Sequence, residues 1–179
     1  YKIASFEIVD HPLIEYIAKK QKPIILSTGM ASIKEIYEAV KIIKKNKNHN
    51  IILLHCISNY PSSHKDYNLK MMVKLKKEFN LHIGLSDHSM GEEVALAAAA
   101  LGAKVIEKHV KLKGDKYSLD SKFSMDTEKF ENYCIKNTNW LDKHLLPKIV
   151  KNTNKEAILI EFRNLNHLYF LIRNTIRVL

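Results

Sequence analysis

Two histidines close two short apolar runs that lie on either side of a helical pattern. His88 follows the run GLSD, His109 follows KVIEK, and the alanine-rich stretch GEEVALAAAALGA between them is typical of a helix. A strand, a helix and a second strand in this order form a βαβ unit, whose two strands are parallel neighbours. Adjacent strands lie about 4.8 Å apart, so side chains at their carboxyl ends can reach one point. We therefore predict that both histidines hold a divalent metal, with four polar residues around them: Ser86, Asp87, Glu107 and Lys108.

Polar residues also stand at or just after the end of every strand that the apolar runs predict. These runs cover residues 2–5, 23–29, 50–58, 81–87 and 104–110. The polar residues at their ends are Ser5, Glu7, Ser27, Thr28, Ser58, Tyr60, Ser86, His88, Glu107 and His109. In a parallel barrel these ends share one face, and serine hydroxyls arranged there suit a phosphate or a carboxylate. Lys2 can add a positive charge if the first strand ends or bulges before Ser5, because the two residues differ in parity.

The stretches between the runs carry helical signals. Asp10 precedes His11-Pro12, as expected of an N-cap with proline in the first turn. A helix is predicted from Ser32 to Lys45, and two more at 69–79 and 127–145. The predicted strands begin about 21 to 32 residues apart, which is the βα repeat of a TIM barrel. Periodicity leaves two folds open, namely an open doubly wound sheet or the last five units of a (β/α)8 barrel.

Composition excludes several classes of protein. The chain has 179 residues, of which 46% are hydrophobic, and 29 Lys and Arg against 19 Asp and Glu give a net charge of +10. Most lysines lie at the ends and on the surfaces of predicted helices, where they suit the helix dipole and solvent. The sequence shows no nucleic-acid-binding module, and no apolar run approaches the roughly 20 residues of a membrane span. We therefore expect neither nucleic acid nor a membrane as a partner. Cys56 and Cys134 form no disulfide framework, which favours a reducing compartment, the cytoplasm.

Five segments of the chain resemble the NeuB family of sialic acid synthases. They are KIASFEI, ILSTGMAS, LLHCISNYP, GLSDHSMG and VIEKHVKL, at residues 2–8, 25–32, 53–61, 84–91 and 105–112. Any one of these motifs is weak, but five in the right order and at the right spacing are strong together. The resemblance implies a TIM (β/α)8 barrel, with about its last five βα units in residues 1–146. Residues 147–179 are then an atypical tail, in which the antifreeze-like domain of the family is not recognisable.

The resemblance also implies a reaction and a set of site residues. The family condenses phosphoenolpyruvate with the open-chain aldehyde of an N-acetylated amino sugar, giving a nine-carbon 2-keto acid and phosphate. By resemblance, His88 and His109 hold Mn²⁺ or Mg²⁺. Five residues bind phosphoenolpyruvate: Lys2, Ser5, Ser27, Ser58 and Ser86. Glu7, Tyr60 and Asp120 complete the catalytic site, although the Gly-Pro that usually precedes this aspartate is here Ser118-Leu119.

Two residues direct the resemblance toward one branch of the family. Phe6 stands where the N-acetylneuraminate and legionaminate synthases tend to have Gly, and Ser58 where they tend to have Asn. Both favour the pseudaminate type, with a 2,4-diacetamido-2,4,6-trideoxyhexose rather than N-acetylmannosamine as acceptor. The full-length form is expected to be a domain-swapped homodimer. The chain alone is expected to be inactive and poorly folded, because five βα units leave two exposed sheet edges.

Three alternatives remain open at this point. The first is an N-acetylneuraminate or legionaminate synthase, which differs in the acceptor sugar. The second is a lyase or aldolase that uses Lys108 as a Schiff-base lysine, but Lys108 alternates with Glu107 and His109 and is therefore expected to point away from the barrel interior. The third is an inactive α/β remnant with at most a binding role.

Overall fold

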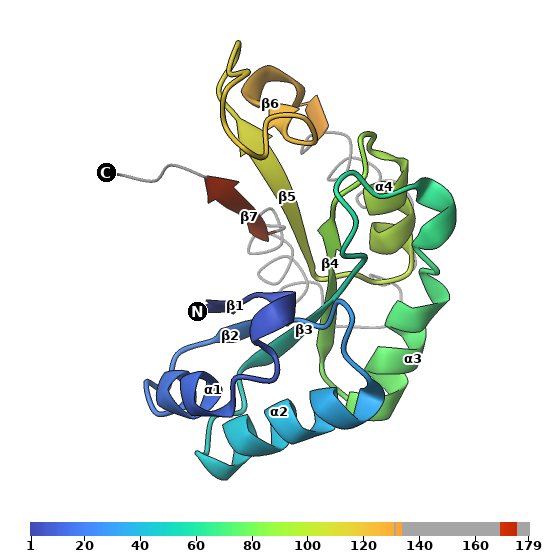
Figure 1. Ribbon diagram of the computed structural model, residues 1–179. Helices are drawn as coiled ribbons and strands as arrows, with labels where there is room; N and C mark the ends of the chain where they lie inside the picture. The colour runs from blue at the N-terminus through green and yellow to red at the C-terminus, as the bar shows by residue number, and fades with distance from the viewer. Residues whose placement is uncertain (131, 134–168, 175–179) are drawn as a thin grey trace, which may run out of the picture.

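A curved parallel sheet forms the centre of the molecule (Figure 1). The computed structural model describes residues 1–130, 132–133 and 169–174. Its strands are β1 (Lys2–Ile3), β2 (Ile24–Ser27), β3 (Ile51–Cys56), β4 (His82–Asp87), β5 (Val105–Lys111), β6 (Met125–Asp126) and β7 (Tyr169–Asn174). They pair in the order β1-β2-β3-β4-β5-β6, and β7 also pairs with β5. Every one of these pairings is parallel.

Four α-helices follow the first four strands and connect each to the next. They are α1 (His11–Ala18), α2 (Ile33–Lys45), α3 (Lys70–Phe79) and α4 (Glu93–Ala100), and two short 3₁₀ turns are η1 (Ser5–Glu7) and η2 (His64–Asp66). Because crossovers between parallel strands are right-handed, a sheet whose strands follow chain order carries its helices on one face. Figure 1 shows the four helices along the outer face of the curve. The fold is thus half of a parallel α/β barrel, as predicted, and not a doubly wound sheet.

Two of the predicted helix starts are confirmed by their caps. The Asp10 carboxylate accepts a hydrogen bond of 3.0 Å from the backbone N–H of Leu13. At the start of α2, Ser32 Oγ accepts from the N–H of Glu35, whose carboxylate in turn accepts from the N–H of Ser32 at 2.7 Å. This reciprocal capping box satisfies amide groups that the first helical turn leaves without partners.

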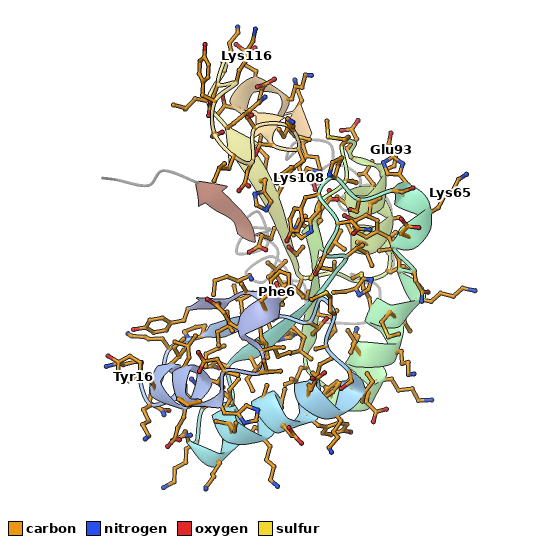
Figure 2. All side chains as sticks on the ribbon, in the orientation of Figure 1. Phe6, Tyr16, Lys65, Glu93, Lys108 and Lys116 are labelled. Carbon is orange, nitrogen blue, oxygen red and sulfur yellow. The ribbon has the colours of Figure 1, made fainter. Side chains whose placement is uncertain are left out.

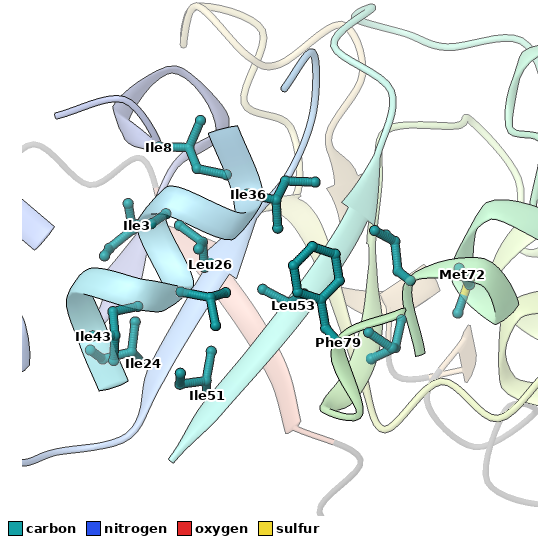
Figure 3. Close-up of a cluster of buried hydrophobic side chains, with 14 of the residues drawn as sticks. Ile3, Ile8, Ile24, Leu26, Ile36, Ile43, Ile51, Leu53, Met72 and Phe79 are labelled. Atoms are coloured by element: carbon teal, nitrogen blue, oxygen red, sulfur yellow. The ribbon is translucent and has the colours of Figure 1, made fainter. Parts of the chain in front are cut away.

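The hydrophobic core fills the space between the sheet and the helices (Figure 3). Alternate strand residues point toward the helices, where they pack with apolar side chains of α1, α2 and α3; the buried set includes Ile3, Ile24, Leu26, Ile51, Leu53, Ile83, Leu85, Ile14, Ile36, Ile43, Met72 and Phe79. Since successive side chains of a strand point to opposite faces, the residues between them face the inside of the curve. Those inner positions carry the polar side chains Lys2, Ser27, Ser86 and Glu107.

The first strand is shorter than predicted. It ends at Ile3, and residues Ser5–Glu7 form the turn η1, because the Glu7 carboxylate accepts a hydrogen bond of 2.7 Å from the backbone N–H of Ala4. This early end removes the parity conflict between Lys2 and Ser5. The predicted loop after β5 likewise contains a short strand, β6.

Beyond β6 the described residues are few. The helix predicted at 127–145 is present at 127–130 and 132–133, and its remainder lies outside the described residues, as does most of the tail at 147–179. Within that tail the backbone of β7 pairs with β5 from Val105 to Val110. β5 is therefore not an outer edge of the sheet along this stretch, because β7 pairs with it. None of the helices in the described ranges is long and apolar enough to cross a membrane.

Candidate active site

His88 and His109 meet at the carboxyl ends of β4 and β5. Their preceding residues, Asp87 and Lys108, are direct partners in the register of the two strands. Both rings are buried, with centroids 5.4 Å apart and planes inclined at 62°. A metal bound about 2.1 Å from one nitrogen of each ring would set the centroids on the order of 5 Å apart. The pair therefore fits two ligands of one ion.

The surroundings of His88 fix its protonation. Its Nδ1 lies 2.7 Å from the carbonyl oxygen of Ile57, which can only accept, so Nδ1 carries the proton. The Nε2 lone pair is then directed into the site, 3.1 Å from Ser86 Oγ. Burial lowers the pKa of His88 to about 4, against a smaller opposing effect of the Ile57 carbonyl. His88 is consequently neutral near pH 7, which is the form that binds metals.

The ring of His109 lies between a carboxylate and aromatic side chains. Asp120 Oδ2 is 3.4 Å from its Nδ1, so the loop after β5 brings the predicted aspartate to the predicted metal ligand. The Phe123 ring lies 5.1 Å from the His109 ring and 5.1 Å from the Tyr60 ring, centroid to centroid. Tyr60 in turn lies 4.2 Å from His88. Tyr60 and Phe123 thus form one wall around the two imidazoles.

Glu107 links the metal end of the site to Lys2. Its Oε1 accepts a hydrogen bond of 2.6 Å from Ser86 Oγ, and its Oε2 lies 3.5 Å from Lys2 Nζ. Sequence reasoning placed Glu107 near the histidines but gave it no role. The available signal was its spacing of two from His109, which puts both side chains on the inner face of β5.

Ser5, Gly29 and Ser58 come together just after the ends of β1, β2 and β3. A Cβ atom added to Gly29 would lie 2.4 Å from Ser5 Cβ and 2.9 Å from Ser58 Oγ, and the φ of Gly29 is +30°. Cys56 Sγ joins them, because it lies 3.0 Å from Ser5 Oγ and accepts a hydrogen bond of 3.1 Å from the N–H of Gly29. Burial raises the pKa of this thiol, so it stays protonated. Neither Cys56 nor Gly29 was among the predicted site residues, since an apolar run and a turn glycine carry no chemical signal of their own.

Two serine hydroxyls of the site have no protein partner within the described ranges. Ser27 Oγ and Ser58 Oγ are both buried and make no hydrogen bond there. By contrast, the neighbouring Thr28 hydroxyl donates to the carbonyl oxygen of Leu54 at 3.0 Å and therefore has a structural role. Buried polar atoms are nearly always paired, so the two serines are candidates for contacts to a bound ligand.

Glu7 and Phe6 lie at the rim rather than inside. The Glu7 side chain is exposed, and its contact with Ala4 makes it first of all the cap of its own turn. Phe6, labelled in Figure 2, is 64% exposed on the same turn. Of the ten predicted residues along the strand ends, Glu7 thus faces solvent, and the Thr28 hydroxyl is held by the Leu54 carbonyl.

The protein ligands for a metal are incomplete in this part of the chain. No group of three or more His, Cys, Asp or Glu that could hold an ion is found among residues 1–130, 132–133 and 169–174. The imidazoles of His88 and His109 still fit the metal type predicted, with Asp120 beside them. An ion held there would need its other ligands from substrate, water or further protein.

Lys108 does not reach this site. Its Nζ lies 2.8 Å from Asp87 Oδ2, on the side of the sheet that faces the helices, and is 5.6 Å from the ring centroid of Tyr133. The side chain is 1% exposed and paired as a cation. A Schiff-base lysine must reach the substrate, and Lys108 does not.

Comparison with known proteins gives a consistent family. A model of the NeuB family matches residues 1–144. Pseudaminic acid synthase of Campylobacter jejuni is 48% identical over 131 residues, which cover 73% of this chain and 38% of that protein. The N,N'-diacetyllegionaminic acid synthase of the same organism is 46% identical over 136 residues, covering 75% of this chain and 41% of that protein. The chain thus spans about two-fifths of the length of these relatives.

A solved structure agrees with the sequence comparisons. The N-acetylneuraminic acid synthetase of Leptospira borgpetersenii serovar Hardjo-bovis, crystallised with citrate, superimposes with a TM-score of 0.76 at 37% identity. The match covers 91% of this chain and 56% of that chain. The half-barrel described above therefore corresponds to part of a synthase barrel.

Proposed function

Because the chain belongs to the NeuB family, we propose that it carries part of the active site of a sugar-acid synthase, which condenses phosphoenolpyruvate with the aldehyde of an N-acetylated amino sugar. The observation that carries the proposal is the convergence of serine hydroxyls and two buried imidazoles on one end of a parallel half-barrel. In the reaction a carbon–carbon bond forms between C3 of phosphoenolpyruvate and the aldehyde carbon. Water adds at C2, and phosphate leaves.

The donor substrate is assigned to the serine side of the site. Lys2 supplies positive charge, and four serines are assigned to the phosphate and carboxylate: Ser5, Ser27, Ser58 and Ser86. To donate to the anion, Ser86 would have to give up its hydrogen bond to Glu107. The unpaired Ser27 and Ser58 hydroxyls support this assignment, because a bound anion would give them the partners that they lack among the described residues. The Lys2 ammonium group lies 3.5 Å from the Glu107 carboxylate. Binding of phosphoenolpyruvate would therefore have to weaken this ion pair.

The acceptor aldehyde is assigned to the histidine side. His88 and His109 would hold Mn²⁺ or Mg²⁺, and such an ion would act as a Lewis acid toward the aldehyde oxygen. Asp120 orients His109 and is placed to hold the attacking water or a sugar hydroxyl. The Tyr60 ring, 4.2 Å from the His88 ring, would cover one side of the reacting atoms. Glu7, at the rim, is left to contact sugar hydroxyls.

The preferred acceptor is a 2,4-diacetamido-2,4,6-trideoxyhexose. Phe6 presents an apolar ring at the mouth of the site, which suits the methyl end of a 6-deoxy sugar better than a hydroxymethyl group. Burying a hydroxyl without a partner costs on the order of 1–3 kcal/mol. The nearly equal identities to pseudaminate and legionaminate synthases keep the second branch as the alternative. Action as a homodimer in the cytoplasm completes the proposal.

A chimeric enzyme tests this function. The matching segment of the Campylobacter jejuni pseudaminic acid synthase is replaced by the corresponding residues of this chain, and the product with phosphoenolpyruvate is followed for each acceptor. Turnover of the trideoxyhexose at least tenfold above that of N-acetylmannosamine is expected. Equal or faster turnover of N-acetylmannosamine would move the chain to the sialate branch. A folded chimera without turnover of either sugar would favour the inactive remnant.

A further inference from the structure

A buried ion pair lies directly behind the two histidines, between the sheet and the helices. We propose that its members, Asp87 and Lys108, are positioning residues that fix His88 and His109 relative to each other. This inference rests on the proposed function, because it concerns the residues assigned to the metal. It gives a role to two charged side chains that do not reach the site themselves.

The register of the sheet couples each charge to one histidine. Asp87 and Lys108 are Cα partners in the β4–β5 pairing, and each directly precedes a histidine. Their exposed fractions are 0% and 1%, and the Nζ to Oδ2 distance is 2.8 Å. Successive side chains of a strand point to opposite faces of the sheet. Because Asp87 and Lys108 point toward the helices, the next residues, His88 and His109, point side by side toward the inside of the curve.

The Asp87 carboxylate is completely satisfied by its neighbours. Its Oδ1 accepts hydrogen bonds from Tyr67 Oη at 3.1 Å and from the N–H and Oγ of Ser89 at 2.9 and 2.6 Å. Its Oδ2 accepts from Lys108 Nζ at 2.8 Å and from Tyr133 Oη at 3.2 Å. These partners allow the carboxylate only one orientation. They thereby also fix the backbone of His88 and Ser89, which follow Asp87.

Lys108 ties β5 to the segment after His88. Besides the ion pair, its ammonium group donates to the backbone carbonyl oxygens of Ser89 and Gly91, at 2.5 and 3.3 Å. These carbonyls belong to the turn between β4 and α4. One cation on the strand of His109 therefore holds the turn that carries His88.

Tyr67 extends the clamp to the backbone of His88 itself. Its hydroxyl accepts a hydrogen bond of 2.7 Å from the N–H of His88 and donates its own proton to Asp87. Ser62 donates its Oγ proton to the same hydroxyl at 2.6 Å and its backbone N–H to the carbonyl oxygen of His88 at 3.0 Å. Both main-chain polar groups of His88 are thus held by residues linked to Asp87.

Stability alone does not account for this arrangement. Replacing a buried ion pair by apolar residues of similar volume is often neutral or stabilising, whereas removing one partner costs about 3–5 kcal/mol. A charged pair with this many directed hydrogen bonds instead excludes alternative orientations of the turn and of the strand register. Histidines that must present nitrogens to one ion need that restriction.

The test uses the chimera described above and a neutral pair, Asp87→Asn with Lys108→Met. This double variant keeps the side-chain volumes and leaves no buried charge without a partner, whereas Lys108→Met alone is expected to unfold the chain. Hydrogen exchange provides a reading that needs no metal. Amides of His88 and Ser89 should exchange at least tenfold faster in the double variant, while the β4 amide of Leu85 stays unchanged. Unchanged exchange at His88 would overturn the proposal, and so would a double variant that fails to fold.

Mn²⁺ titration provides the second reading. The affinity should fall about 10- to 100-fold in the double variant, as is typical when residues supporting metal ligands are lost. Asn48→Ala is the matched control, because Asn48 is also buried and donates to the carbonyl oxygen of Lys22 at 2.9 Å, away from the site. It should lower the melting temperature and leave Mn²⁺ affinity unchanged. If the wild-type chain binds no Mn²⁺, the metal assignment fails, and the exchange data still decide whether the clamp exists. Equal affinities of wild type and double variant, with Mn²⁺ bound, would contradict the clamp.

Discussion

Ser86 donates a hydrogen bond of 2.6 Å to Glu107, its direct partner in the pairing of β4 with β5. The bond uses the single proton of the Ser86 hydroxyl, so this proton is not available to the Nε2 lone pair of His88, 3.1 Å away. The contact therefore sets the direction of a hydroxyl that stands between the proposed donor site and the proposed metal. Ser27, two strands away at the end of β2, makes no such bond within the described ranges.

This difference predicts that replacing serine by alanine lowers stability at position 86 but not at position 27. Ser86→Ala leaves the buried Glu107 Oε1 without its donor and should lower the free energy of unfolding by about 1–3 kcal/mol. Ser27→Ala removes a hydroxyl that has no described partner and should leave stability unchanged or slightly raised. Urea unfolding of both variants of the chimera measures the difference. An equal loss in the two variants would contradict the contact.

Gly29 predicts a steric effect that has an internal control. In Gly29→Ala the new methyl group would meet Ser5 Cβ at 2.4 Å and Ser58 Oγ at 2.9 Å, so the two serines must move apart. Gly102→Ala also places alanine at a positive φ, of +92°, but its nearest neighbour is Lys76 Nζ at 4.0 Å. Both variants should lose stability through backbone strain, about 1 kcal/mol each. Only Gly29→Ala should raise the KM for phosphoenolpyruvate, by about tenfold or more, and steady-state kinetics of the chimera decide this.

The fold was largely predictable from the sequence, and the site only in part. Apolar runs and the caps at Asp10 and Ser32 are local signals, so strands and helices could be placed to within a few residues. His88 and His109 were found because their matched places on neighbouring strands follow from the βαβ order. The contacts of Cys56 and Phe123 join distant segments and depend on how loops close over the strand ends. The alternation along the strand predicted that Lys108 points away from the barrel interior, but it could not predict that Lys108 pairs with Asp87.

Burial of neutral His88 predicts a loss of stability in acid. Its pKa is about 4 in the folded chain and about 6.5 in the unfolded chain, so below pH 6.5 the unfolded state binds more protons. The contribution of His88 is fully present above pH 6.5, declines as the pH falls, and is lost by about pH 4, where the total loss is about 3 kcal/mol. Comparing the pH profiles of unfolding for the 179-residue chain and its His88→Gln variant isolates this effect. The exposed His49 provides a control, since His49→Gln should leave the profile unchanged.

Phe6 predicts a change of acceptor preference. Phe6→Gly in the chimera removes the apolar ring at the rim, and the ratio of kcat/KM for the trideoxyhexose to that for N-acetylmannosamine should fall about tenfold, since each unpaired hydroxyl costs on the order of 1–3 kcal/mol. Tyr16→Gly, which removes an exposed ring on α1, should leave the ratio unchanged. An unaltered ratio in Phe6→Gly would remove the structural argument for the pseudaminate branch.

The most direct measurement follows phosphate release from phosphoenolpyruvate in the chimera as Mn²⁺ is titrated, with the trideoxyhexose present. Saturable, Mn²⁺-dependent release is expected for the wild-type residues. His88→Ala and His109→Ala should each reduce both Mn²⁺ affinity and release by at least 100-fold while the melting temperature stays within a few degrees. Release that persists at the wild-type level in either folded variant would contradict the assignment of the two histidines and, with it, the proposed active site.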